Sequence, residues 1–371
     1  MVTTPDTAAP GASAFAEALP GPFPHLHVAS AYSLRYGTAF PAELVRRAAE
    51  HGADMLALTD RDGLYGAIKH VAACHEAGIG PIAGADLALA GDREDRVVVL
   101  ARSEGWPRLC RLVTAAHHFG ERGEPRVTPE LVGEHAPGLF VLLGPGSDVG
   151  RAVALRRDQE ARALLDRWRA VAGDAVVIEL VDRYGPREAS NATRMLALAE
   201  ATGVPAVLTN AVRFLDPADH RIGHVLDSAR HLLPLHSRHL ERSTSHAYLK
   251  TGAEMALVAR RVCGGDAERM ARLFAVTRRI ARRCVLDPAE VLGLRADPPR
   301  LHLPEVGSDP VPLLRRRCAD GLRERGLERS KQARRRLAEE LDVIERKGLS
   351  GYFIAVAGIT DMIRGMGVRC A

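Results

Sequence analysis

Short aliphatic runs alternate with longer amphipathic segments between Pro24 and Asn210, and this alternation constrains the fold most strongly. Runs such as Val97-Val98-Val99-Leu100 are apolar at consecutive positions. That pattern is typical of strands covered on both faces, and hence of a parallel sheet. Seven strand–helix repeats predict an α/β barrel or a doubly wound sheet. The predicted strands are residues 24–28, 55–59, 79–84, 96–101, 139–143, 175–180 and 205–209, and the predicted helices are 41–51, 64–77, 105–119, 158–172 and 187–202.

The strand signal fades after Asn210, and the C-terminal part of the chain is predicted to be helical. Six of the 22 prolines fall within residues 287–312, which is typical of a linker. Helical patterns occupy residues 216–230, 253–283 with an interruption at 263–265, 313–325, 331–347 and 352–366. The expected organisation is a disordered tail (1–21), an α/β domain with a helical extension (22–285), a Pro-rich linker (286–312) and a C-terminal segment (313–371).

Composition excludes several classes of protein. Residues 1–21 are rich in Ala, Pro, Thr and Gly and lack a basic residue, which favours a disordered tail over a signal peptide. No apolar run approaches the roughly 18–20 residues that span a bilayer, so no membrane partner is expected. The six cysteines include no C-x-x-C pair, which favours a reducing, cytoplasmic location. The net charge of +5 permits a nucleic-acid partner without requiring one.

Residues that commonly bind metals fall at or near the ends of predicted strands. His25 and His27 are two apart on the first strand, so both would point to one face. Asp60, Asp62 and Asp86 follow the next two strands, at the end where α/β proteins place their chemistry. Imidazoles and carboxylates that converge from different strands are the ligands of divalent metals. The alternative interpretation is that one histidine faces the core and bonds to a backbone group.

Several segments carry a family resemblance, among them PHLHVAS, LTDRDGLYG and GPIAGAD. They are similar to the N-terminal PHP (polymerase and histidinol phosphatase) domain of bacterial C-family DNA polymerases, the polymerase III alpha subunit and its error-prone relatives. Details favour the error-prone branch found in actinobacteria. The resemblance implies a distorted seven-stranded (βα) PHP barrel, followed by a helical segment that begins a polymerase palm. The similar segments are residues 24–30, 58–66, 80–86, 108–113, 209–214 and 351–356.

The resemblance also assigns the positions at which metal-loaded members of the family hold their ions. His27 and Asp86 match ligand positions of the family. Other residues replace the expected ligands at Ala29, Tyr36, Arg61, Arg96, Ala211 and Arg213. Arginine cannot lose its charge in a protein, so its guanidinium competes with a metal for the same carboxylates.

These replacements lead us to expect a degenerate PHP domain without metal. In this hypothesis the three arginines serve as counterions for Asp60, Asp62 and Asp86. The alternative is that His27, Asp60 and Asp86 still hold a single metal ion. Stand-alone phosphoesterase chemistry would need the missing ligands, so the resemblance argues against it.

Residues 349–368 resemble the start of the polymerase palm, in which the family's phosphate-binding loop and Mg²⁺-binding carboxylates follow. No catalytic residue is therefore expected within this chain, which we interpret as truncated and unable to polymerise DNA alone. The basic run Arg334, Arg335 and Arg336 permits contacts with a DNA backbone. The alternative is a solvated helix face, since glutamates are interleaved with the arginines.

The resemblance implies a part of a DNA-directed DNA polymerase III alpha-type subunit, which acts in DNA replication or error-prone repair. Its cofactor would be Mg²⁺ in the palm, and its substrates a DNA primer-template and dNTPs. A sliding clamp and accessory repair proteins are further expected partners. Two alternatives stay open, a PHP metal-dependent phosphoesterase or 3′-5′ exonuclease and a non-catalytic scaffold.

Overall fold

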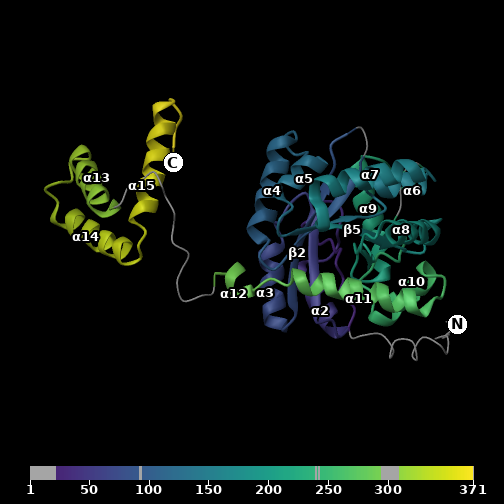
Figure 1. Cartoon of the computed structure of the whole chain (residues 1–371). Helices are drawn as coiled ribbons and strands as arrows, with labels where there is room; N and C mark the ends of the chain where they lie inside the picture. The colour runs from purple at the N-terminus through teal and green to yellow at the C-terminus, as the bar shows by residue number, and fades with distance from the viewer. Residues whose placement is uncertain (1–21, 92–93, 239, 241–242, 294–308, 371) are drawn as a thin grey trace. The chain divides into compact units, whose positions relative to one another are not determined.

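The computed structural model describes residues 22–91, 94–238, 240, 243–293 and 309–370, which belong to two compact units divided after Leu294 (Figure 1). The predicted tail, residues 1–21, lies outside the described residues, as does most of the predicted linker. The boundary between the units falls inside the range predicted as that linker.

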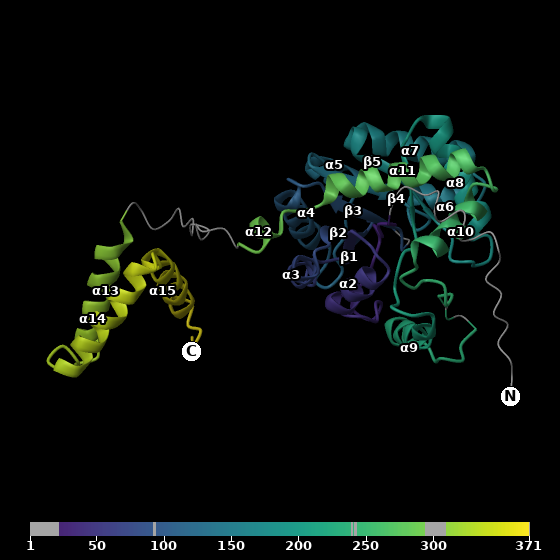
Figure 2. The same cartoon turned by 90° about the horizontal axis from the view of Figure 1, so that it is seen from below.

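A six-stranded sheet forms the centre of the first unit, with the strands in sequence order. Helices lie around this sheet, as both views show (Figures 1 and 2). The strands are β1 (Met55–Arg61), β2 (Gly80–Ala88), β3 (Arg96–Ala101), β4 (Leu139–Leu143), β5 (Val176–Val181) and β6 (Ala206–Thr209). Neighbours are parallel except at β3, which is antiparallel to both β2 and β4.

Residues 24–28, predicted as the first of seven strands, form no continuous ladder. His25 makes a single bridge to Leu56 of β1, and Val28 makes a single bridge to Val212, which follows β6. The segment therefore bonds to opposite edges of the sheet within a few residues. Because it changes partner in this way it is not a regular strand, and the predicted seven strands are corrected to six.

The prediction of a parallel sheet is wrong at β3. Strand β2 ends at Ala88 and β3 begins at Arg96. This connection is too short for the crossover of a dozen or more residues that a parallel pair needs. Consecutive apolar residues indicate that a strand is buried on both faces. A central antiparallel strand is also buried on both faces, so this pattern does not determine the strand direction. The hairpin pairs Ala88 with Arg96, so the start of β3 lies beside the end of β2.

Alternate residues of the strands face two different hydrophobic cores. In β3, Val97 and Val99 belong to the larger core, which the helices between the strands complete. Val98 and Leu100 face the other side, where α11 (Ala267–Cys284) covers the sheet. Figure 2 shows α11 lying across the strands. Polar residues at the ends of these strands form the site described below.

The predicted helices between the strands are confirmed as α2 (Pro41–Glu50), α3 (Ala67–Ala77), α4 (Trp106–Phe119), α7 (Asp158–Ala172) and α8 (Glu188–Thr202). Two short helices, α5 (Pro129–His135) and α6 (Asp148–Ala154), lie outside the predicted ones. Each begins after a hydroxyl residue, Thr128 or Ser147, whose side chain accepts a hydrogen bond from the first turn. These two helices were not predicted because they are too short for a helical period to be recognised in the sequence.

The predicted interruption near residue 264 is confirmed, since α10 (Gly252–Val262) ends before α11 begins. Gly264 and Gly265 lie between them with φ of 65° and 82°, a left-handed conformation that glycine adopts without strain. The remaining elements of the first unit are the 3₁₀ turns η1 (Gly173–Ala175) and η2 (Pro217–Asp219), α9 (His220–His231) and the short α12 (Pro288–Val291).

The second unit consists, in its described part, of α13 (Pro310–Glu324), α14 (Lys331–Arg346) and α15 (Ser350–Gly365). Leu314, Leu341 and Ile354 form its small hydrophobic core. The identification of these helices as the start of a palm stays a prediction. Within the described ranges of the whole chain, no helix has both the length and the apolar character that crossing a bilayer requires.

Candidate functional site

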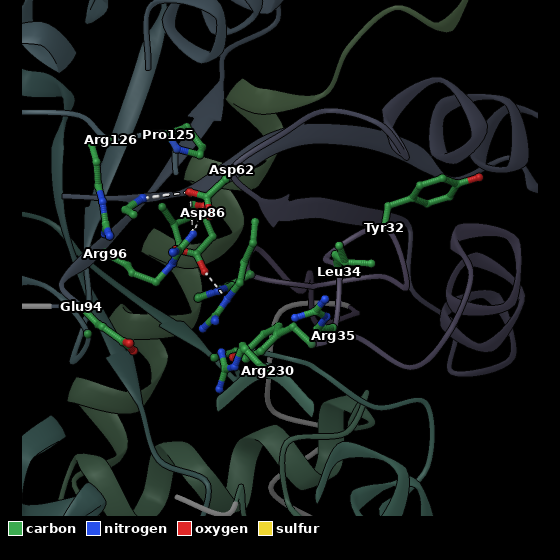
Figure 3. Close-up of a pocket in the computed structure, with 18 of the residues that line it drawn as sticks. Tyr32, Leu34, Arg35, Asp62, Asp86, Glu94, Arg96, Pro125, Arg126 and Arg230 are labelled. Atoms are coloured by element: carbon green, nitrogen blue, oxygen red, sulfur yellow. Dashed lines mark hydrogen bonds and ion pairs between the residues drawn. The ribbon is translucent and has the colours of Figure 1, made fainter. Parts of the chain in front are cut away.

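A cavity of about 870 Å³ opens where β1, β2 and β5 end and β3 begins (Figure 3). Residues 32–36, the end of α9, residues 123–126 after α4 and residues 144–146 after β4 also line it. Charged residues of both signs line it. The arginines are Arg35, Arg61, Arg96, Arg126, Arg183 and Arg230, and the carboxylates are Asp62, Asp86, Glu94, Glu124 and Glu179.

Asp86 lies between two arginines at the base of this cavity. The Nε of Arg96 donates a hydrogen bond to its Oδ1 over 2.9 Å, and the Nε of Arg61 lies 3.3 Å from its Oδ2. Burial alone would raise the pKa of Asp86, but the charges of Arg96 and Arg61 outweigh it and lower that pKa. Both oxygens of this carboxylate therefore face guanidinium groups, and Asp86 is ionised at neutral pH.

Asp62 joins the same network and Asp60 does not. Arg96 donates from Nη2 to Oδ1 of Asp62 over 2.9 Å, so one guanidinium bridges two carboxylates. Asp60 instead accepts hydrogen bonds from the backbone N of Ser30 and from the hydroxyls of Ser30 and Ser33. Burial raises the pKa of Asp60 despite these donors. We expected an arginine to be the counterion of each of the three carboxylates. At Asp60 this expectation is wrong, because serine residues bind that carboxylate instead.

Arg213 approaches none of those carboxylates. It donates two hydrogen bonds to Asp227 of α9, over 3.2 and 2.9 Å, in a buried pair. Arg230 shares Oδ1 of Asp227 over 3.0 Å. Sequence reasoning missed Asp227, because an aspartate in an amphipathic helix is ordinarily solvated. Its position ties α9 to the wall of the cavity.

Tyr36 lies in the midst of these cations. The guanidinium carbons of Arg61, Arg213 and Arg230 are 3.4, 3.9 and 5.4 Å from the centre of its ring. Burial opposes ionisation of the phenol, yet the positive charges of Arg61 and Arg213 lower its pKa to about 8. An aromatic ring with cations stacked on it therefore stands at this position, where the family resemblance led us to expect a metal ligand.

His27 pairs with Glu179, a residue that sequence reasoning also missed. Its Nδ1 lies 2.7 Å from Oε1 of Glu179, which accepts a second hydrogen bond from the hydroxyl of Thr209 over 2.6 Å. Burial lowers the pKa of His27, but Glu179 outweighs this effect and raises the pKa above 6.5. The sequence signal that could have identified Glu179 is its position as the single acid in the otherwise apolar strand Val176–Val181.

The other histidine of the pair has a structural partner. His25 donates from Nε2 to the backbone oxygen of Lys250 over 2.8 Å, and burial lowers its pKa to about 4. Ala29 and Ala211 offer only methyl groups, and Ala211 adopts a φ of 42°. The structure thus brings His27, Arg61, Asp86 and Arg96 together in one site.

Residues 25–183 match the family model described as the PHP domain. The chain is 33% identical to an error-prone DNA polymerase of Symbiobacterium thermophilum, over 94% of this chain and 33% of that protein. It is 32% identical to an error-prone DNA polymerase of Mycobacterium bovis, over 94% of this chain and 32% of the relative. It is 31% identical to the DNA polymerase III subunit alpha of Escherichia coli, over 93% and 30% respectively.

The chain belongs to the PHP-containing, polymerase III alpha-type family. It spans about a third of the length of each of these relatives. The cavity is therefore that of a PHP domain, and all of its lining residues except Ala211, Arg230 and His231 lie within the matched residues.

The residues of this PHP domain do not fit the metal ions that its fold family implies. Among the residues described, no three His, Cys, Asp or Glu side chains are grouped so that they could hold an ion. Asp86 faces two arginines, and Glu179 is bonded to His27 and Thr209. A divalent cation at Asp86 would have to displace or approach guanidinium groups of the same charge.

Arg334, Arg335 and Arg336 lie on α14 of the second unit. Arg335 pairs with Glu339 over 3.0 Å, and Arg336 pairs with Glu340 over 2.8 Å, both within the helix. These exposed pairs correspond to the interleaved charges of the solvated-face interpretation. Whether this helix contacts DNA stays a prediction.

Proposed function

We propose that this chain is the PHP-containing part of a DNA-directed DNA polymerase of the polymerase III alpha type, which acts in replication or error-prone repair synthesis. In this proposal its PHP domain is a non-catalytic, metal-free platform. The observation that supports it best is the pairing of Asp86 with both Arg96 and Arg61.

The pairing supports a metal-free platform for an electrostatic reason. A guanidinium stays charged at every pH at which the protein is folded, so it cannot yield its position by losing a proton. Arg96 also bridges Asp62 to Asp86 and thereby joins the ends of β1 and β2. The arginines provide the cross-link between strand ends that metal ions would provide in a loaded site.

Nucleotidyl transfer would belong to the remainder of a polymerase. Two Mg²⁺ ions held by palm carboxylates would stabilise the attacking and leaving oxygens of the transfer. DNA, dNTPs, a sliding clamp and accessory repair proteins would be partners of that larger assembly. The alternative of a metal-dependent phosphoesterase or exonuclease requires ligands that arginine and alanine replace here.

Two measurements test the proposal. The purified chain is examined for zinc, manganese and iron by elemental analysis, and for hydrolysis of a phosphodiester substrate with and without added Mn²⁺. We expect no stoichiometric metal and no metal-dependent hydrolysis. About one bound ion per chain together with such hydrolysis would refute the metal-free platform.

A chimera tests the polymerase assignment. Residues 22–371 replace the matching third of the Symbiobacterium thermophilum relative, and the same protein without that third is the control. We expect primer extension by the chimera and its loss in the control. Equal inactivity of the two proteins, with both folded, would count against a platform role.

A further inference from the structure

Helix α11 carries a run of arginines without acids. From Arg269 to Cys284 it contains six arginines and no aspartate or glutamate. Its apolar residues, among them Phe274 and Ile280, are buried in the two hydrophobic cores of the sheet that the helix crosses (Figure 2). The arginines therefore occupy the remaining surface of the helix.

Four of these arginines lie on one exposed face of α11, and we call them the basic row. Arg272, Arg279 and Arg283 are seven and four residues apart, and Arg282 comes three residues after Arg279. Side chains at these spacings share one face of a helix, and all four are exposed. From Arg272 to Arg283 the basic row extends over about 16 Å, at a rise of about 1.5 Å per residue.

Acids balance only some of the arginines of α11. The three that form ion pairs are Arg269 with Glu200, Arg272 with Glu268, and Arg278 with Asp54. Among the residues that the structure describes, no acid forms an ion pair with Arg279, Arg282 or Arg283. Cations in the last turn of a helix interact favourably with its dipole. This effect applies to Arg282 and Arg283, but Arg279 lies more than a turn from the helix end.

A further cation adjoins the end of the basic row. The guanidinium carbons of Arg102 and Arg283 lie 4.3 and 5.0 Å from the centre of the Phe140 ring. Burial and repulsion from Arg283 lower the pKa of Arg102, whose Nε is buried without a hydrogen-bond partner. The acids that act on Arg102 are Glu104 and Asp174, and neither forms an ion pair with it in the described part of the chain. Positive charge is therefore incompletely balanced here.

This basic surface lies at the edge of the sheet opposite the PHP cavity. Strand β3 begins at Arg96, which lines the cavity, and ends just before Arg102. Six residues of extended chain separate the two arginines by about 20 Å. Neither Arg102 nor any residue of α11 lines the cavity. The surface is therefore separate from the charged site described above.

The chemistry of the basic row favours a polyanion over a protein as its partner. No large apolar side chain of α11 is exposed, although protein partners are ordinarily held by aromatic and aliphatic anchors. Contacts with a nucleic-acid backbone are made by arginine and lysine and need no apolar anchor. Over about 16 Å each strand of a duplex presents about five phosphates, so the row is long enough to contact several of them.

We propose that the basic row, with Arg102 beside it, binds the sugar–phosphate backbone of a nucleic acid without regard to sequence. The binding is non-covalent, and its free energy comes from charge-assisted contacts and from the release of counterions. This inference goes beyond the proposed function, which makes the PHP domain a platform and assigns DNA to the remainder of a polymerase. It gives the platform a nucleic-acid contact of its own.

Fluorescence anisotropy titrations of the whole chain test the proposal. The probes are a labelled single strand of DNA and a labelled duplex, each in two unrelated sequences, at salt concentrations from about 50 to 200 mM. We expect affinity that is the same for both sequences and that falls as the salt concentration rises. The probe bound more tightly identifies the form of nucleic acid that the surface accepts. Poly-L-glutamate, added as a competitor, represents an acidic protein.

A triple substitution locates the surface. Arg279→Gln, Arg282→Gln and Arg283→Gln together remove three exposed charges and introduce a residue of similar helix propensity. We expect affinity for the duplex at low salt to fall roughly tenfold, and the slope of log K against log salt concentration to fall by about 2 to 3. The matched control replaces arginines 334–336 of α14 by glutamine. It removes the same charge from arginines interleaved with glutamates and should change affinity less than about twofold.

Thermal unfolding of each variant checks that it is folded. If the triple variant does not fold, Arg279→Gln alone tests the surface, with an expected reduction of the salt slope by about 1. The proposal is overturned if the intact chain binds neither probe, or if the folded α11 variant binds as tightly as the α14 control. Competition by poly-L-glutamate equal to that by unlabelled DNA would overturn it in favour of an acidic protein. None of these results bears on polymerase membership, and a failed chimera would leave this surface standing.

Discussion

Arg96 holds Asp86 by a hydrogen bond of 2.9 Å between Nε and Oδ1, at the junction of two antiparallel strands. The side chain of Asp86 is 6% exposed and that of Arg96 is 18% exposed, so water screens the pair only weakly. The same guanidinium reaches Asp62. Removal of this one cation therefore affects two carboxylates.

We expect Arg96→Met to reduce the free energy of unfolding by about 3 kcal/mol, because it leaves the buried carboxylate of Asp86 with one guanidinium, that of Arg61, in place of two. Urea unfolding at neutral pH measures this change. Arg96→Met combined with Asp86→Leu should recover most of the loss, since both charges are then absent. Arg167→Met is the control, because Arg167 and Glu130 form an exposed pair worth at most about 1 kcal/mol. An Arg96→Met variant as stable as this control would contradict the prediction.

Replacement of the arginines by histidine should create metal affinity. We expect Arg61→His combined with Arg96→His to bind zinc or manganese, because two imidazoles would then adjoin Asp86 in place of the two guanidinium groups that pair with it. Elemental analysis after dialysis and the rise in melting temperature with added metal measure the gain. Arg111→His controls for surface binding. A chain that already carries stoichiometric metal before substitution would contradict this reasoning.

Tyr36 should make stability depend on pH above neutrality. Its pKa is about 8 in the folded chain and 10.0 ordinarily, so folding favours the phenolate. The stabilisation is therefore fully present above pH 10 and is lost as the pH falls through 8. Relative to Tyr36→Phe, the intact chain should gain up to about 2–3 kcal/mol between those limits, at no more than about 1.4 kcal/mol per pH unit.

Urea unfolding of both proteins at several pH values measures this difference, and ultraviolet absorbance of tyrosinate follows the ionisation directly. The groups that act on the phenol are Arg61, Arg213, Arg183 and Asp86, with Arg230 also stacked near the ring. These groups are present in both proteins, so their own titration cancels. A stability difference that is constant with pH would show that the phenol ionises normally.

The basic run on α14 should contribute little to DNA binding. Arg335 and Arg336 are each paired with a glutamate one turn away. We expect replacement of Arg334, Arg335 and Arg336 by alanine to change DNA affinity less than about twofold, as for exposed, internally balanced charges. Fluorescence anisotropy titrations across salt concentrations measure it. A large loss of affinity, with a salt slope reduced by about 3, would instead assign phosphate contacts to these residues.

Much of the sheet could be predicted from local pattern, and its strand directions could not. Residues 96–101 and 139–143 were predicted with the bounds of β3 and β4, because uninterrupted apolar runs reveal burial. Direction depends on the connection, and the short link from Ala88 to Arg96 was the signal against a parallel pair. The segment around His27 has strand-like composition, yet its partners on either side come from opposite edges of the sheet.

Residues of the site could be predicted only at the positions that the family resemblance assigned. His27, Arg61, Asp86 and Arg96 were named in advance and lie together. The two acids that complete the charge pattern, Glu179 and Asp227, were missed. The sequence around an acid does not show that the acid will pair with an arginine or a histidine distant in the chain. Such pairs form only when the strands come together and α9 packs against them.

The β2–β3 hairpin has a consequence for the order of folding. Asp86 and Arg96 are ten residues apart and lie on adjacent strands of one hairpin. Closing so short a loop costs little chain entropy, so their ion pair can form before the rest of the sheet assembles. A metal centre would have to wait until distant strands had gathered its ligands. The arginine can therefore join the two strand ends early in folding, before residues distant in sequence have come together.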